Sequence, residues 1–132
     1  GEKLKTAEDL MLTKDKIPFI DEAKLMTKAL RIMTEKKLGT LIVRNKKKYT
    51  TGIITDGQVR RFNSKNIDLK SLKVKDVMTK NPIKIEKNIL ATKALAIMNE
   101  KKITSLCVYE QKNKLKTIGI LHIHNILNKK IY

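Results

Sequence analysis

Residues 25–43 read LMTKALRIMTEKKLGTLIV, and residues 90–108 return to the same pattern as LATKALAIMNEKKITSLCV. Twelve of these nineteen positions are identical without a gap. Self-similarity of this kind indicates one supersecondary unit that is present twice. The duplication therefore determines how the rest of the chain is interpreted.

The flanks of the two copies agree as well. Asp9-Leu10-Met11 matches Asp76-Val77-Met78 before the duplicated stretch, and Gly52-Ile53-Ile54-Thr55 matches Gly119-Ile120-Leu121-His122 after it. We interpret the chain as a linker with a cloning remnant, a first repeat, a polar connector and a second repeat, at residues 1–8, 9–62, 63–75 and 76–132.

Each repeat predicts the order strand, helix, strand, strand, helix. In the first repeat, apolar residues recur at helical spacing over 25–33, between a short extended run at 17–20 and a buried strand at 40–43. A return strand at 51–54 leads into a helix that ends near Phe62, with Thr55 as its expected N-cap. The second repeat is expected to place the same elements at 83–85, 90–101, 105–109, 115–121 and 123–128.

The expected fold class is α/β, of the mixed α+β kind. One repeat is too small to fold stably alone, so we expect two repeats related by a pseudo-twofold axis to share a core. The chain has 132 residues, 41% of them apolar, which suits a folded domain. No apolar run approaches the roughly 20 residues of a membrane-spanning helix.

The charge is high, with 30 Lys and Arg against 13 Asp and Glu and a net charge of +17. Proteins that read nucleic acid favour arginine forks and stacked aromatics, whereas this chain has 4% aromatic residues and no Trp. We interpret the lysines mainly as compositional background that also attracts anions. Binding of nucleic acid through diffuse charge is kept as an alternative, to be recognised by a steep salt dependence.

The order of elements, with Gly-apolar-apolar-Thr on the return strand, resembles the cystathionine-β-synthase (CBS) domain in a tandem pair. Asp9-Leu10-Met11, Ile17-Pro18 and residues 52–61 look like the first CBS repeat of bacterial arabinose-5-phosphate isomerases, and residues 76–82 and 121–127 look like the second. The resemblance implies a regulatory region that follows a sugar-isomerase domain. The parent enzyme would interconvert D-ribulose 5-phosphate and D-arabinose 5-phosphate for 3-deoxy-D-manno-octulosonate synthesis, toward lipopolysaccharide or capsule.

The resemblance also implies binding partners and a cellular location. We expect a cytoplasmic protein that contacts the isomerase domain of its own parent chain and forms a homo-oligomer through CBS pairs, without a membrane. A small anionic metabolite (a nucleotide, a nucleotide-sugar or a sugar phosphate) is expected in the cleft between the repeats. The candidate cleft residues are Ile17, Pro18, Thr55, Asp56, Gly57, Gln58, Met78, Thr79, Lys80, Pro82, His122, His124 and Asn125.

The turn at Thr55 has a physical reason to bind an anion. The first N–H groups of a helix are unpaired and carry partial positive charge, and Gly57 allows close approach. A plain N-cap without a ligand is the alternative. CBS pairs that bind adenosine nucleotides commonly carry Asp where this chain has Gln58 and Asn125, which predicts weak binding of those nucleotides.

No catalytic constellation is visible. Cys107 lies in a buried strand pattern and is expected to be inert packing. His122 and His124 are one residue apart and could face one side, but no third ligand lies nearby to complete a metal site. We therefore expect no catalysis in this fragment, no metal and no cofactor, with a ligand-free oligomerisation module as the alternative to a sensor.

Overall fold

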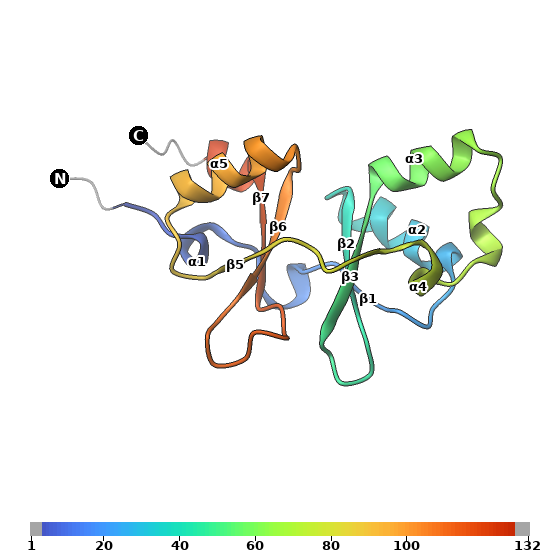
Figure 1. Ribbon diagram of the computed structural model, residues 1–132, viewed down its shortest axis with the longest axis horizontal. Helices are drawn as coiled ribbons and strands as arrows, with labels where there is room; N and C mark the ends of the chain where they lie inside the picture. The colour runs from blue at the N-terminus through green and yellow to red at the C-terminus, as the bar shows by residue number, and fades with distance from the viewer. Residues whose placement is uncertain (1–3, 129–132) are drawn as a thin grey trace. The chain divides into compact units, whose positions relative to one another are not determined.

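The computed structural model describes residues 4–128 and divides them into two compact units (Figure 1). The central unit is Pro18–Pro82, and the terminal unit combines the segment that ends at Ile17 with the segment that begins at Ile83. The order strand, helix, strand, strand, helix is confirmed in each, and so is the mixed α+β class. Each unit has its own cluster of buried apolar side chains.

The central unit holds a four-stranded sheet in the order β1-β2-β3-β4. β1 runs parallel to β2, while β2–β3 and β3–β4 are antiparallel. Its elements are β1 (Phe19–Asp21), α2 (Met26–Lys36), β2 (Thr40–Arg44), β3 (Thr50–Thr55), α3 (Asp56–Ser64), the 3-10 turn η2 (Leu69–Ser71), α4 (Val74–Val77) and β4 (Thr79–Lys80).

The terminal unit repeats this plan with a three-stranded sheet in the order β5-β6-β7. Its elements are α1 (Ala7–Leu10), η1 (Lys14–Lys16), β5 (Lys84–Glu86), α5 (Ala91–Lys101), β6 (Ser105–Tyr109), β7 (Gly119–His122) and α6 (Ile123–Leu127). The first and last strands are shorter than the sequence suggests. Ile17 and Pro18 precede β1, and residues 115–118 precede β7, with Leu115 53% exposed.

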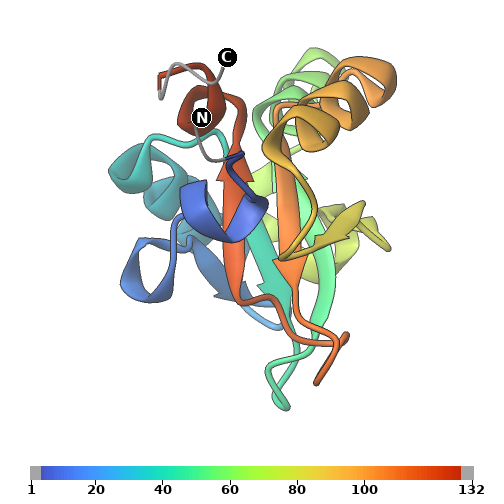
Figure 2. The same cartoon turned by 90° about the vertical axis from the view of Figure 1, so that its left-hand side faces the viewer.

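The compact units do not coincide with the sequence repeats. α1 stands at the start of the chain, yet it lies beside β7 of the terminal unit (Figure 2). The Ala7 N–H donates to the Ile89 carbonyl at 2.8 Å, and the Ala91 N–H donates to the Lys5 carbonyl at 2.8 Å. These bonds satisfy N–H groups at the starts of both helices. Residues 5–12 thus form a docking segment for the half of the chain that follows Ile83.

The central unit has an equivalent docking segment at residues 72–80. Here the Val74 N–H donates to the Lys24 carbonyl and the Met26 N–H donates to the Leu72 carbonyl, both at 2.8 Å. Leu69 and Val74, which lie in the connector expected at 63–75, are buried in the core of the central unit. The turn η2 buries Leu69, and the one-turn helix α4 buries Val74 and Val77. Elements this short show no apolar periodicity in the sequence.

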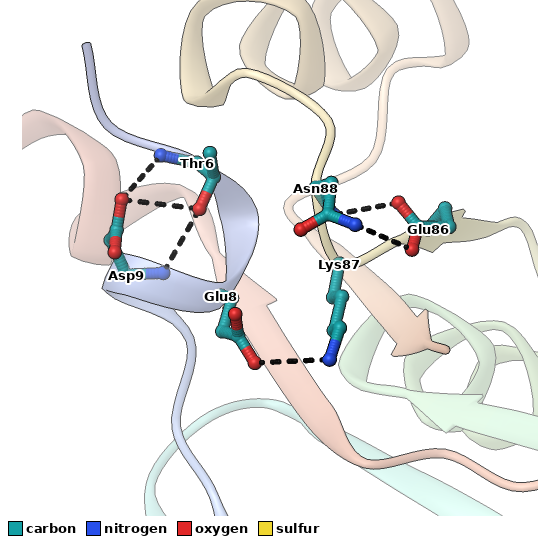
Figure 3. Close-up of polar contacts among 6 residues, drawn as sticks. All are labelled: Thr6, Glu8, Asp9, Glu86, Lys87 and Asn88. Atoms are coloured by element: carbon teal, nitrogen blue, oxygen red, sulfur yellow. Dashed lines mark hydrogen bonds and ion pairs between the residues drawn. The ribbon is translucent and has the colours of Figure 1, made fainter. Parts of the chain in front are cut away.

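Side-chain contacts hold the first docking segment in place (Figure 3). Thr6 and Asp9 form a reciprocal cap on α1, with the Thr6 N–H donating to the Asp9 carboxylate at 2.8 Å. Glu8 forms an ion pair with Lys87 in the turn between β5 and α5, at 3.6 Å. An exposed pair of this kind contributes little energy, so it orients α1 more than it stabilises the fold.

A methionine after each short helix lies against a glycine of the return strand. A Cβ added to Gly52 would come within 2.5 Å of the Met78 sulfur and 2.9 Å of the Thr79 carbonyl oxygen. A Cβ added to Gly119 would overlap the Met11 sulfur and stand 3.1 Å from the Leu12 carbonyl oxygen. Both glycines are required by close approach, which explains why the Asp-apolar-Met and Gly-apolar-apolar motifs recur together.

We expect Gly52→Ala and Gly119→Ala each to lower the free energy of unfolding by about 1–3 kcal/mol, the usual cost of overpacking a tight contact. Gly57→Ala is the matched control, because a Cβ there meets no atom closer than 3.4 Å. Urea denaturation followed by circular dichroism measures all three variants. Unchanged midpoints for the first two would show that the docking segments yield freely.

Candidate functional site: the strand-to-helix turns

The turn from β3 into α3 is closed by a reciprocal cap. The Gln58 N–H donates to the Thr55 hydroxyl oxygen at 3.4 Å, and the Thr55 N–H donates to the Gln58 side-chain carbonyl at 2.7 Å. The expected N-cap at Thr55 is therefore confirmed. Both bonds satisfy donors that a helix start leaves open.

Gln58 also ties this turn to the docking segment. Its side-chain NH₂ donates to the Thr79 hydroxyl at 2.6 Å and to the Val77 carbonyl at 3.2 Å. The residue is only 6% exposed. Its amide is thus occupied inside the central unit rather than projecting toward a ligand. The Gln58 side chain therefore has its oxygen and its NH₂ group engaged within the protein.

Two arginines reach back over the first turn of α3. An atom placed at the Cβ position of Gly57 would lie 3.4 Å from Arg61 Nη1 and 3.9 Å from Arg60 Nη2, with the Thr55 hydroxyl at 3.8 Å. The space beside Gly57 is therefore bordered by two guanidinium groups and a hydroxyl. We call Thr55, Gly57, Arg60 and Arg61 together the Gly57 turn.

The sequence analysis did not include these arginines in the candidate site. Their signal was available, because positions three and four residues after Gly57 lie on the same face of a helix. The Asp56 carboxylate lies against Gly39, where an added Cβ would come within 2.5 Å of it.

The corresponding turn of the terminal unit uses a histidine. His122 Nδ1 accepts from the His124 N–H at 3.1 Å, and the His122 N–H donates to the Asn125 side-chain oxygen at 2.8 Å. Asn125 thus has the capping role that Gln58 has in the central unit. The rings of His122 and His124 stack with centroids 4.8 Å apart. The pair closes the end of β7 as a cap.

His122 is 9% exposed, and its surroundings oppose protonation. Burial, with a smaller contribution from the neighbouring His124, lowers the pKa of His122. The cap gives a further reason, because a protonated Nδ1 has no lone pair with which to accept from the His124 N–H. The neutral imidazole is the form that the fold requires.

A pH dependence follows from this lowered pKa. The unfolded chain binds a proton at His122 more tightly than the folded chain does, so the free energy of unfolding falls as pH drops below about 6.5. His122→Thr introduces the Thr of the equivalent position in the central unit and should make this part of the curve flatter. Urea titrations at pH 5, 6 and 7 compare the two chains. Equal slopes would contradict the proposed origin.

The structure separates the sequence-predicted candidates into two groups. Thr55, Asp56, Gly57, Gln58, Met78, Thr79 and Lys80 come together in the central unit, where β3 pairs with β4 and Gln58 joins the turn to Thr79. His122, His124 and Asn125 come together in the terminal unit. Ile17 and Pro18 are buried, and Pro82 closes the central unit. The cleft between the repeats stays a prediction.

Other chemistry is limited within residues 4–128. No three His, Cys, Asp or Glu side chains gather there as they would around a metal ion. Cys107 is buried, and burial raises the pKa of its thiol to about 11, against smaller opposing effects of a hydrogen bond from Thr117 and the charge of Lys84. A thiol in this state is a poor nucleophile. Within the same range, no helix has the length and apolar character needed to cross a bilayer.

Comparison with known proteins gives the family. The sequence pattern of the CBS domain matches residues 7–65 and 74–131. The chain therefore belongs to the CBS domain family, as a tandem pair. The match begins with each docking segment and ends after each capped helix, so it follows the sequence repeats and not the compact units.

Individual relatives show which proteins with CBS domains the chain is similar to. The chain is 37% identical over 97% of its length to protein RP505 of Rickettsia prowazekii, which is uncharacterised, and 35% identical over 90% of its length to the arabinose 5-phosphate isomerase KdsD of Escherichia coli K12. It spans 39% and 35% of those proteins. Among solved structures, CBSX2 in complex with AMP has the same fold, with a TM-score of 0.81, 24% identity and 94% coverage of both chains.

Proposed function

We propose that this CBS pair is the regulatory region of an arabinose-5-phosphate isomerase and that it senses a small anionic metabolite at the Gly57 turn. A nucleotide, a nucleotide-sugar and a sugar phosphate share the required chemistry, namely a phosphate group on an organic body. The observation that carries the proposal is the convergence of Arg60, Arg61 and the Thr55 hydroxyl on the space beside Gly57.

Three physical effects favour a phosphate in that space. The start of α3, a nine-residue helix, carries partial positive charge. Guanidinium groups bind phosphate through two parallel N–H donors, and such charge-assisted bonds are roughly twice as strong as neutral ones. Gly57 offers no side chain to obstruct the anion. CBSX2 has the same fold and is in complex with AMP, which is a phosphate ester, and this supports a phosphate-bearing ligand.

Regulation requires that the ligand bind two states of the protein unequally. Gln58 provides a physical connection, since it joins the Gly57 turn to Val77 and Thr79 of the docking segment. A ligand that pulls on the first turn of α3 would also act on that segment. The isomerase domain of the parent chain, in the cytoplasm, is the partner that would receive the change, as the similarity to KdsD suggests.

A ligand-free oligomerisation module is the second candidate function. Leu25 and Leu90 occupy matching positions at the starts of the long helices and are 50% and 39% exposed. Exposed leucines repeated in both copies would suit pairing with another chain. Analytical ultracentrifugation together with ligand titration separates the two functions, because this module needs association and no ligand.

For the sensor, we expect at least one of three probes to raise the melting temperature: AMP, a cytidine nucleotide-sugar or arabinose 5-phosphate. A probe at 100 times its dissociation constant adds about 2.7 kcal/mol of stability. Gly57→Ala fills the space between the guanidinium groups without a clash, so it should weaken binding while leaving the fold intact. Thermal-shift assays at fixed salt measure both effects.

The charge control is a pair of double variants. Arg60→Gln with Arg61→Gln should abolish the thermal shift, whereas Lys101→Gln with Lys116→Gln removes equal charge from exposed sites of the terminal unit and should preserve it. Equal loss in both variants would assign the binding to diffuse charge. No shift with any probe, together with self-association, would favour the oligomerisation module.

We also expect that the 132-residue chain alone does not interconvert ribulose 5-phosphate and arabinose 5-phosphate. The reason is the chemistry found within residues 4–128, where Cys107 is a buried thiol and the two histidines are engaged in a cap. A coupled assay of the purified chain tests this. Turnover that persists after further purification would contradict the assignment as a regulatory region.

A further inference from the structure

A basic pocket lies in the central unit, on elements other than the Gly57 turn. It has a volume of about 310 Å³ and is bordered by β1, the first half of α2 and the hairpin that joins β2 to β3. Asp21 is the only acidic residue in its lining. The cations of the lining are Lys24, Lys28, Arg44, Lys46 and Lys48.

Arg44 is held in place at the wall of this pocket. Its guanidinium carbon lies 3.6 Å from the centroid of the Phe19 ring, on the neighbouring parallel strand. Partial burial lowers the pKa of Arg44, and the nearby Asp21 opposes that effect, so the group stays charged. A guanidinium stacked on a ring keeps its N–H edge directed outward for a bidentate partner.

Hydrogen bonds fix the main chain of the hairpin that carries Lys46 and Lys48. The Asn45 side-chain oxygen accepts from the N–H groups of Lys47 at 3.0 Å and Tyr49 at 3.1 Å, which fixes the turn. Lys48 adopts the left-handed conformation with φ of 66°. Within residues 4–128, none of the four pocket lysines forms an ion pair. Five cations are therefore gathered around one hollow with only Asp21 to balance them, and an anion that binds there relieves their repulsion.

The terminal unit provides an internal comparison, because the same backbone plan carries different charges there. The gapless repeat pairs Lys24 with Ile89 and Arg44 with Tyr109, whereas the hairpin that follows is two residues longer in the terminal unit and carries Lys112, Lys114 and Lys116. The equivalent positions contain two cations, Lys84 and Lys93, and two acids, Glu86 and Glu110. Arg44 is therefore the cation of the lining that the terminal unit replaces with an aromatic residue.

Both copies have a cation over an aromatic ring at this place, but the strand that carries the cation and the strand that carries the ring are exchanged. In the terminal unit the Lys84 ammonium lies 5.4 Å from the Tyr109 ring centroid, where the central unit has Phe19 and Arg44. That ammonium is already used, since it donates to the Lys114 carbonyl at 2.8 Å. The cation–aromatic contact is therefore a structural feature of both units, and a guanidinium in that contact is specific to the central unit.

We propose that the basic pocket binds a small organic anion that carries two or more phosphate groups. Arg44 would take one phosphate through its N–H edge, and the lysines of α2 and the hairpin would take the other. Phe19 and Ile32 supply apolar surface for the organic body. The volume lies at the lower end of the roughly 300–1,000 Å³ of ligand sites, which suits a metabolite rather than a polymer. The site does not depend on the proposed function.

Isothermal titration calorimetry at 0.15 M salt, with fructose 1,6-bisphosphate and fructose 6-phosphate as probes, tests the proposal on the full chain. We expect saturable binding of the bisphosphate, at least tenfold tighter than the monophosphate. Lys46→Gln with Lys48→Asn should weaken it at least tenfold. The matched control is Lys112→Gln with Lys114→Asn, which removes two hairpin lysines from the terminal unit and should change the affinity less than twofold.

The remaining outcomes are equally decisive. Equal weakening in both double variants, or no saturable binding, would overturn the pocket. Duplex DNA that binds more tightly than the bisphosphate and depends on Lys46 and Lys48 would also overturn it, in favour of a nucleic-acid surface. Arg60→Gln with Arg61→Gln should leave bisphosphate affinity within twofold of native, so failure of the sensor at the Gly57 turn and failure of this pocket are distinguishable.

Discussion

The contact of a methionine with a glycine of the return strand is the constraint on which both compact units depend. Met78 lies against Gly52 and Met11 against Gly119, so close that a single added carbon would collide with sulfur or with main-chain oxygen. These contacts place α4 and α1 at the starts of the long helices, where main-chain bonds join them to the rest of each unit. Residues 5–12 precede β1 of the central unit but belong to the terminal unit. Residues 72–80 precede β5 of the terminal unit but belong to the central unit. A glycine is needed at that point because the interior tolerates no extra volume.

The capped turns build directly on this docking. Gln58 closes the start of α3 and at the same time donates to Val77 and Thr79, so the turn and the docking segment share one hydrogen-bond network. Asn125 and His122 achieve the closure of α6 with a shorter side chain and an imidazole. The two copies therefore keep the geometry of the turn and differ in its chemistry: one has arginines beside a glycine, the other a pair of stacked histidines.

The charge of the chain acquires meaning only when it is placed on the fold. A net charge of +17 is compatible with background composition, and lysines occur along the whole chain. Two local concentrations stand out against it. One is the pair of guanidinium groups at Gly57, and the other is the pocket where five cations face one carboxylate. The second copy has Leu127 and Asn128 in place of Arg60 and Arg61, so the duplication supplies its own control for the Gly57 turn.

The sequence by itself determined the duplication, the order of elements and the family, because twelve identities in nineteen positions and a helical apolar period survive without knowledge of contacts. It also identified Thr55 as a cap, since capping is local in the chain. The helical spacing of Arg60 and Arg61 after Gly57 could also be read from the chain. Only the tertiary structure decided which unit each docking segment joins and that Gln58 is occupied. It alone gathered Lys24, Arg44 and Lys48 around one pocket. These are contacts between positions far apart in the chain or set by side-chain direction, and no periodicity records them.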